Sequence, residues 1–127
     1  MRFMMAMPLV LLPLLGTAAQ ADANKAESNT RMDVMCEATM SALADNARAH
    51  GQPSAALSKV AYAAHASWLR SHPDADAGVY RTAQKVRAAS IRQAMHDGRI
   101  TLADTMSRMV ACHTRYEGAP QMVASLD

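Results

Sequence analysis

Apolar residues recur every three or four positions along four stretches of the chain, which is the spacing of one helix face. In the first stretch, about residues 30–50, these positions are Met32, Met35, Cys36, Met40, Leu43 and Ala47. In the second, about residues 54–71, they are Leu57, Val60, Ala61, Ala64 and Trp68. Two more helices are predicted over about residues 75–96 and 101–116. The expected fold class is therefore all-α.

Turn and cap signals separate these helices. Gly51 and Pro53 end the first, "SHPDADAG" interrupts the chain after the second, and Gly98 follows the third. Thr30 begins a Thr-x-x-Asp pattern and is predicted to cap the first helix. Thr101 begins the same pattern in "TLAD" and is predicted to cap the fourth helix. Short connections favour a small antiparallel four-helix bundle in which the first and last helices are neighbours.

The N-terminus has the features of a secretory signal peptide. Arg2 precedes an apolar run over about residues 3–15, and Ala19-Gln20-Ala21 is a small-residue cleavage motif. We expect cleavage after Ala21, which leaves residues 22–127 as a single helical domain. The apolar run is too short for a good membrane span, so no stable membrane anchor is expected. The predicted localisation is periplasmic or secreted.

Two cysteines, Cys36 and Cys112, occur in the whole chain. In an oxidising exported compartment they are expected to form one disulfide between the first and fourth helices. Loop-closure entropy predicts about 4 to 5 kcal/mol of stabilisation for a loop of this length. The pairing also agrees with an antiparallel arrangement, because Cys36 lies early in its helix and Cys112 late.

Methionines flank both cysteines. Met32 and Met40 lie one helical turn on either side of Cys36, and Met109 precedes Cys112 by three residues. Thioethers suit Cu(I), but they also fill irregular gaps in small cores, and we expect this second role and no cofactor.

Haem is a further alternative. The absence of Cys-x-x-Cys-His excludes ordinary covalent c-type attachment. The layout of the chain is nevertheless similar to that of soluble b-type cytochrome four-helix bundles. That resemblance would place the axial ligands at Met32 or Met35 and at His113.

A basic stripe is predicted on the third helix. Arg81, Lys85 and Arg92 fall close to one line along it, and we interpret them as a contact surface for an acidic partner, with a solvated face as the alternative. The formal net charge of the chain is only +2, which gives no electrostatic case for nucleic-acid binding.

Catalytic and metal motifs are lacking. The sequence has no Gly-x-Ser-x-Gly, no His-Glu-x-x-His and no Gly-rich phosphate loop, so we do not expect an enzyme. Asp33 and Glu37 are expected at the surface from the helix periodicity. His65 and His72, with Trp68 between them, are interpreted as structural residues lining a solvent-facing groove.

Two strings, "CEATMSALAD" at residues 36–45 and "WLRSHPD" at residues 68–74, resemble the Rap/Tai-type immunity proteins, which protect bacteria from secreted toxins in the periplasm. Pro53 precedes the second string at a similar distance. That family has more cysteines, one of them soon after the third helical segment, whereas here a fourth helix carries Cys112. The resemblance implies stoichiometric binding of a toxin domain and transfers no binding residue.

We therefore predict an exported, non-catalytic helical protein that binds another macromolecule. The specific version of this prediction is an immunity-type inhibitor of a toxin. The alternatives are a periplasmic haem b or copper carrier and a structural envelope protein.

Overall fold

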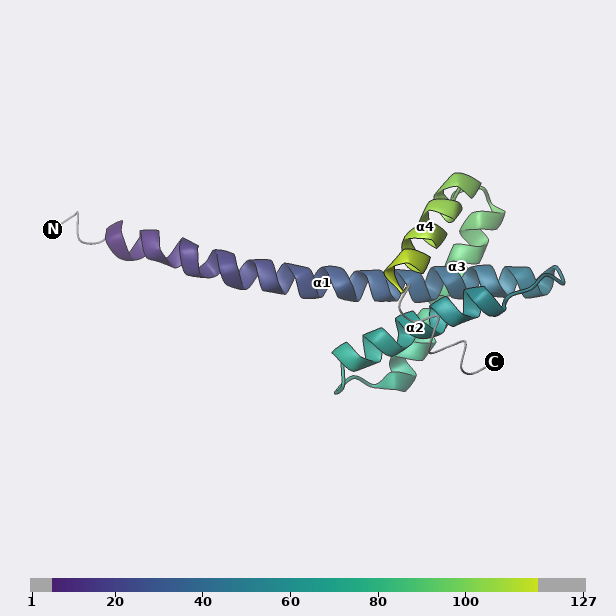
Figure 1. Ribbon diagram of the computed structural model, residues 1–127, viewed down its shortest axis with the longest axis horizontal. Helices are drawn as coiled ribbons and strands as arrows, with labels where there is room; N and C mark the ends of the chain where they lie inside the picture. Colours follow the sequence, from purple (N-terminus) through teal and green to yellow (C-terminus); the bar gives the residue numbers. More distant parts are fainter. Residues whose placement is uncertain (1–5, 117–127) are drawn as a thin grey trace. The chain divides into compact units, whose positions relative to one another are not determined.

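The computed structural model describes the backbone of residues 6–116 and the side chains of residues 24–116. This part of the chain forms four helices and no strand: α1 (Ala6–Ala49), α2 (Ala55–Ser71), α3 (Ala77–His96) and α4 (Leu102–Arg115) (Figure 1). The predicted all-α fold class is confirmed. None of these helices combines the length and the apolar character that a membrane span requires.

The chain divides into two compact units, Met1–Arg31 and Met32–Asp127, and α1 contributes to both. In the first unit, Thr30 lies inside the helix, where its hydroxyl donates to the Ala26 carbonyl at 3.0 Å. The predicted cap at Thr30 is therefore wrong. Residues 17–29, directly before it, contain no Gly or Pro and include helix-favouring residues such as Ala26 and Glu27, so hydrogen bonding continues through this position. Cleavage after Ala21 stays a prediction.

The other helix ends lie close to their predicted positions. The Asp76 carboxylate caps α3 by accepting from the backbone N–H groups of Gly78 and Val79, at 2.9 and 3.1 Å. Thr101 caps α4 by accepting from the Asp104 N–H at 3.1 Å. Gly51 and Gly98, with φ of 67° and 75°, follow α1 and α3 in the left-handed conformation that ends many helices.

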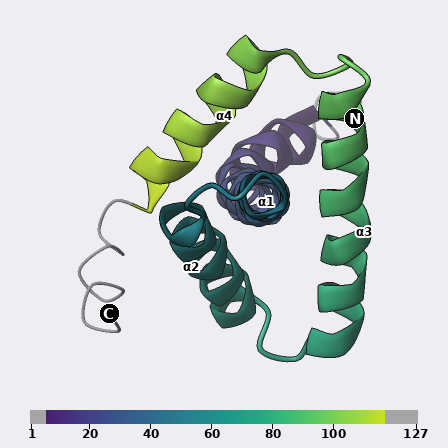
Figure 2. The same cartoon turned by 90° about the vertical axis from the view of Figure 1, so that its right-hand side faces the viewer.

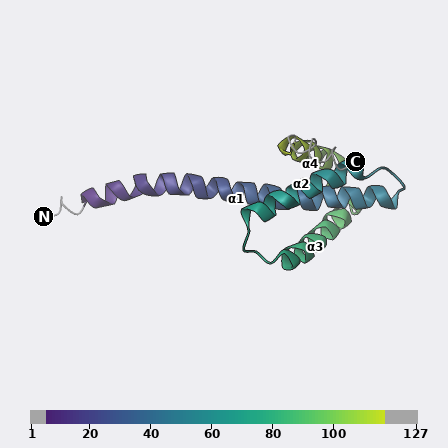
Figure 3. The same ribbon diagram turned by 60° about the horizontal axis from the view of Figure 1, so that its bottom comes forward.

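In the second unit, α2 turns back beside the C-terminal part of α1 (Figures 1 and 3). Viewed along α1, the three shorter helices lie around it on different sides (Figure 2). Figure 1 shows α3 and α4 steeply inclined to α1 rather than aligned with it. The predicted antiparallel bundle is not confirmed. Because the three shorter helices surround it, the part of α1 over residues 33–47 has contacts on most of its circumference.

The core of this unit is built around sulfur. Cys36 of α1 and Cys112 of α4 are paired at disulfide distance, with Cα atoms 5.4 Å apart, which confirms the predicted pairing. The buried residues of this cluster are Cys36, Met40, Ala61, Ala64 and Cys112. Partly buried residues pack around them: Met32, Leu43, Leu57, Val60, Met109 and Tyr116. Small alanines and flexible thioethers thus fill the space beside the disulfide, as expected for a methionine-rich core.

Candidate binding groove

Two carboxylates of α1 are buried in the second unit. Asp33 is 1% exposed and Glu37 is 9% exposed. The prediction that both lie at the surface was therefore wrong. A single apolar stripe indicates one buried face, whereas this segment of α1 is covered on several sides by α2, α3 and α4 (Figure 2). Polar residues outside the apolar stripe, such as Asp33 and Glu37, are consequently enclosed as well. Buried polar residues require hydrogen-bond partners.

Glu37 obtains its partners from α2 and α3. The Tyr80 hydroxyl donates to Glu37 Oε1 at 2.8 Å, and His65 Nδ1 lies 3.0 Å from the same oxygen. Gln84 Nε2 donates to the Tyr80 oxygen at 3.1 Å and to the Val34 carbonyl at 3.0 Å. Burial raises the pKa of Tyr80, and its hydrogen bond to Glu37 raises it further. Tyr80 therefore stays a neutral donor, and Glu37 is held against α3.

Asp33 is held in the same way by α2 and α4. The Ser67 hydroxyl donates to Asp33 Oδ2 at 2.8 Å, and the Tyr116 hydroxyl donates to Oδ1. Arg115 Nη2 lies 3.4 Å from Oδ1. Burial is the main cause that raises the pKa of Tyr116, with the hydrogen bond to Asp33 as a second cause. The two carboxylates are thus structural acceptors that connect α1 to all three shorter helices.

Trp68 and His65 of α2, and His72 directly after α2, form ring contacts with one another and with Tyr80 of α3; both histidines are half-buried. Trp68 is 9% exposed and stacks on Tyr80, with ring centroids 3.7 Å apart. His72 stacks on Trp68 at 4.2 Å, and His65 lies 5.5 Å from the Tyr80 ring. Their role in the described structure is packing and hydrogen bonding.

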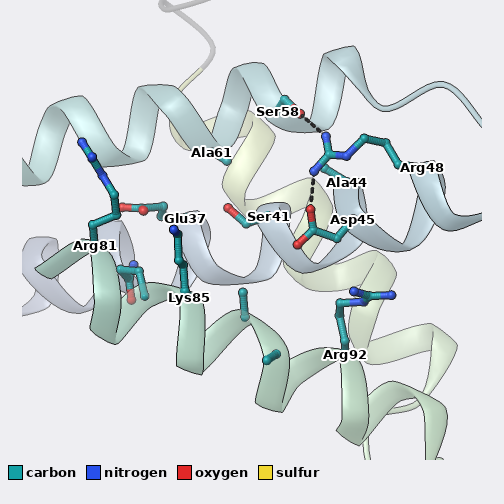
Figure 4. A pocket seen from close by; sticks show the side chains of 13 residues that line it. Glu37, Ser41, Ala44, Asp45, Arg48, Ser58, Ala61, Arg81, Lys85 and Arg92 are labelled. Carbon is teal, nitrogen blue, oxygen red and sulfur yellow. Dashed lines mark hydrogen bonds and ion pairs between the residues drawn. The ribbon is translucent and has the colours of Figure 1, made fainter. Parts of the chain in front are cut away.

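A groove of about 500 Å³ lies between α1, α2 and α3 beside this network (Figure 4). Its lining combines charged residues with small ones: Glu37, Ser41, Ala44, Asp45, Arg48, Ser58, Ala61, Arg81, Gln84, Lys85, Ala88, Ala89 and Arg92. We refer to it as the basic groove. In Figure 4 the side chains of Arg81, Lys85 and Arg92 rise from α3 toward α1 and α2. The structure thus brings all three residues of the predicted basic stripe to one groove.

The acidic residues of the basic groove already have partners. Asp45 forms an ion pair with Arg48, which also donates to the Ser58 hydroxyl at 3.4 Å. Glu37 accepts from Tyr80, as described above. Over residues 24–116, by contrast, no ion pair or hydrogen bond is formed by the side chains of Arg81, Lys85 and Arg92.

Arg48 is a groove residue that the sequence analysis missed. It lies 33 residues before Arg81 in the numbering and on another helix. No spacing rule within one helix relates the two positions. Only the return of α3 across α1 makes Arg48 part of the same groove.

A second groove of about 320 Å³ is lined mainly by apolar residues of α1, α2 and α4: Met40, Ala56, Leu57, Val60, Met109, Val110, His113 and Thr114. Of the three alternative haem ligands, only His113 lines it, and His113 is exposed. Met32 packs against the disulfide cluster, and Met35 is half-buried. The described structure therefore does not bring the three into one groove. Within the described residues there is also no group of three His, Cys, Asp or Glu side chains arranged to hold a metal ion.

Comparison of the chain with protein-family models, with curated proteins and with solved structures gives no match. The resemblance to the Rap/Tai-type immunity proteins thus stays a prediction from two short strings. Residues of these strings that the structure buries, such as Cys36, Ala44 and Trp68, are core positions.

Proposed function

We propose that this protein is an exported, non-catalytic binding protein and that the basic groove contacts an acidic surface of a protein partner. The observation that carries this proposal is the contrast inside the groove. Its two carboxylates are engaged by Tyr80 and Arg48, while Arg81, Lys85 and Arg92 have no ion-pair partner among the described residues. Carboxylates of a partner would supply the missing counter-charges.

The three cations are exposed, so each contact with a partner carboxylate is screened by water and salt. Exposed ion pairs contribute about 0.2 to 1 kcal/mol each. Complementary charge at a surface of this kind mainly accelerates association and excludes wrong partners. We therefore expect salt-sensitive binding whose remaining affinity comes from surfaces around the groove.

A binding role also agrees with the construction of the unit. The disulfide joins α1 to α4, and the hydrogen bonds of Glu37 and Asp33 join α1 to all three shorter helices. The contacts of Glu37 and Asp33 hold α2 and α3 against α1, and these three helices line the groove. A preorganised surface loses less conformational entropy when it binds.

The non-catalytic assignment rests on the lining. Glu37 is the only groove carboxylate beside an imidazole, and His65 is not among the groove-lining residues. The basic groove thus offers cations, hydroxyls and an amide for recognition, without a nucleophile adjacent to a base.

Stoichiometric inhibition of a toxin is one form that such binding would take, as the resemblance of residues 36–45 and 68–74 implies. The disulfide and the predicted signal peptide support a periplasmic or secreted location for it. Such binding requires a cross-linked scaffold and a charged face, and the disulfide and the cations of the basic groove support this role.

The experiment is a capture assay on the exported fraction with quantitative mass spectrometry. The bait is the wild-type protein, the variant R81E/K85E/R92E, or the matched control K25E/R70E/R99E, which changes the net charge equally at exposed positions outside the groove. We expect a protein retained by wild type and control but lost from the groove variant. Equal retention by all three baits would remove the basic groove as the contact surface.

A further inference from the structure

The three cations of α3 form a straight row. At 100° per residue, positions 81, 85 and 92 lie within about 40° of one another around the helix axis. At 1.5 Å per residue, the row is about 16 Å long. Figure 4 agrees, because Arg81, Lys85 and Arg92 follow one another along α3 and extend in the same general direction.

The lining between this row and the opposite helices is made of small side chains. Ala44 of α1, Ala61 of α2 and Ala88 of α3 are buried, at 1%, 7% and 6% exposure. Ser41, Ser58 and Ala89 complete this part of the lining. Long side chains occur at the rim, where Arg48 lies across from the α3 row (Figure 4). A lining of this kind lets the backbone of a partner element approach closely, while the charges contact its side chains.

We infer that the occupant of the basic groove is an α-helix of the partner that carries a row of carboxylates and lies along α3. This inference rests on the proposed function and specifies the partner's structure. Acidic residues spaced i, i+4 and i+11 on such a helix form a row with the same length and straightness as Arg81, Lys85 and Arg92. Recognition would be of the helix-in-groove type, with charge in place of the usual apolar anchors.

The test uses two synthetic helical peptides of identical length and composition. In the first, three Glu residues occupy positions i, i+4 and i+11. In the second, the same three Glu residues are distributed around the helix. We expect the wild-type protein to bind the row peptide about tenfold more tightly in fluorescence anisotropy at low salt, since only that peptide meets all three cations at once. Equal affinity for the two peptides would overturn the inference.

Two substitutions on α3 test whether the helix contacts the lining. Ala89 lines the groove and is exposed, so Ala89→Trp fills part of the groove without changing its charge. Ala83 is also exposed on α3 but does not line the groove, so Ala83→Trp is the matched control. We expect the Ala89 variant to lose the row peptide and the control to retain it. Retention by both would mean that no helix enters the groove.

Failure of the inference and failure of the proposed function give different results. In the first case, the wild-type protein binds poly-L-glutamate, R81E/K85E/R92E abolishes this binding, and both helical peptides bind equally. The basic groove then recognises acidic chains, and only the inference that the partner element is a helix fails. If poly-L-glutamate binding is the same in wild type and the groove variant, the basic groove does not recognise acidic partners and the proposed function fails with the inference.

Discussion

The Tyr80 hydroxyl of α3 donates a hydrogen bond of 2.8 Å to Glu37 of α1, across a separation of 43 residues. Glu37 and Gln84, which also bonds to Tyr80, both line the basic groove. This contact therefore fixes the distance between the helix that carries the cations and the helix opposite. The fold and the proposed binding surface share the same residues.

Removing the Tyr80 hydroxyl should destabilise the protein. Tyr80→Phe keeps the ring that stacks on Trp68 but leaves Glu37 without one donor and Gln84 without one acceptor. A buried group that loses its partner costs about 1 to 3 kcal/mol, and we expect this loss in the free energy of unfolding, measured by urea denaturation. Tyr62→Phe is the control, because Tyr62 is 63% exposed, and it should change stability very little. Equal stabilities of the two variants would show that the Glu37 contact is energetically unimportant.

The protein should also lose stability at alkaline pH. Burial and nearby carboxylates raise the pKa of Tyr80 and of Tyr116 in the folded state. An unfolded tyrosine releases its proton near pH 10, so above that pH the folded state holds protons that the unfolded state has lost. The free energy of unfolding then falls as pH rises, by at most about 1.4 kcal/mol per pH unit for each tyrosine.

The measurement is the free energy of unfolding between pH 8 and 11 for wild type, Tyr80→Phe and the double variant Tyr80→Phe/Tyr116→Phe. The alkaline slope should decrease stepwise along this series. A slope that is the same in all three proteins would assign the pH dependence to other groups.

The disulfide should contribute a large part of the stability. It closes a loop with a sequence separation of 76 residues around a core of small side chains. Cys36→Ala/Cys112→Ala should lower the free energy of unfolding by about 4 to 5 kcal/mol by the loop-closure relation, while circular dichroism stays helical at low temperature. Chemical reduction of wild type should give a similar loss. Denatured, unreduced wild type should not react with a thiol reagent, and quantitative labelling of both cysteines would contradict the pairing.

Local signals in the sequence were sufficient for most of the helices and for the disulfide. Residues 54–71, 75–96 and 101–116 were predicted within two residues of α2, α3 and α4, because Pro53, the string "SHPDADAG" and Thr101 are signals that act on their own neighbours. The pairing of Cys36 with Cys112 followed from there being no other cysteines. The row of Arg81, Lys85 and Arg92 could be predicted from residue spacing because all three residues lie on one helix.

The errors concern properties that depend on several helices at once. The start of α1 was misplaced because the Thr30 cap signal competed with helix-favouring residues before it, and continued helical hydrogen bonding prevailed. Glu37 and Asp33 were assigned to the surface because periodicity describes one face, whereas three helices enclose this segment. Arg48 joins the basic groove only through tertiary packing. The signal peptide and the toxin-binding role stay predictions.

The most direct test of the account is the affinity of the protein for an acidic chain, measured by isothermal titration calorimetry with poly-L-glutamate over a series of salt concentrations. Wild type and the control K25E/R70E/R99E should bind at low ionic strength and weaken as salt is added, because exposed charges within the groove are screened. The variant R81E/K85E/R92E should not bind detectably, while its melting curve stays near that of wild type, since exposed substitutions change stability by about 0.5 kcal/mol or less. Binding by this variant at the affinity of the control would contradict the assignment of the basic groove as an acidic-partner site.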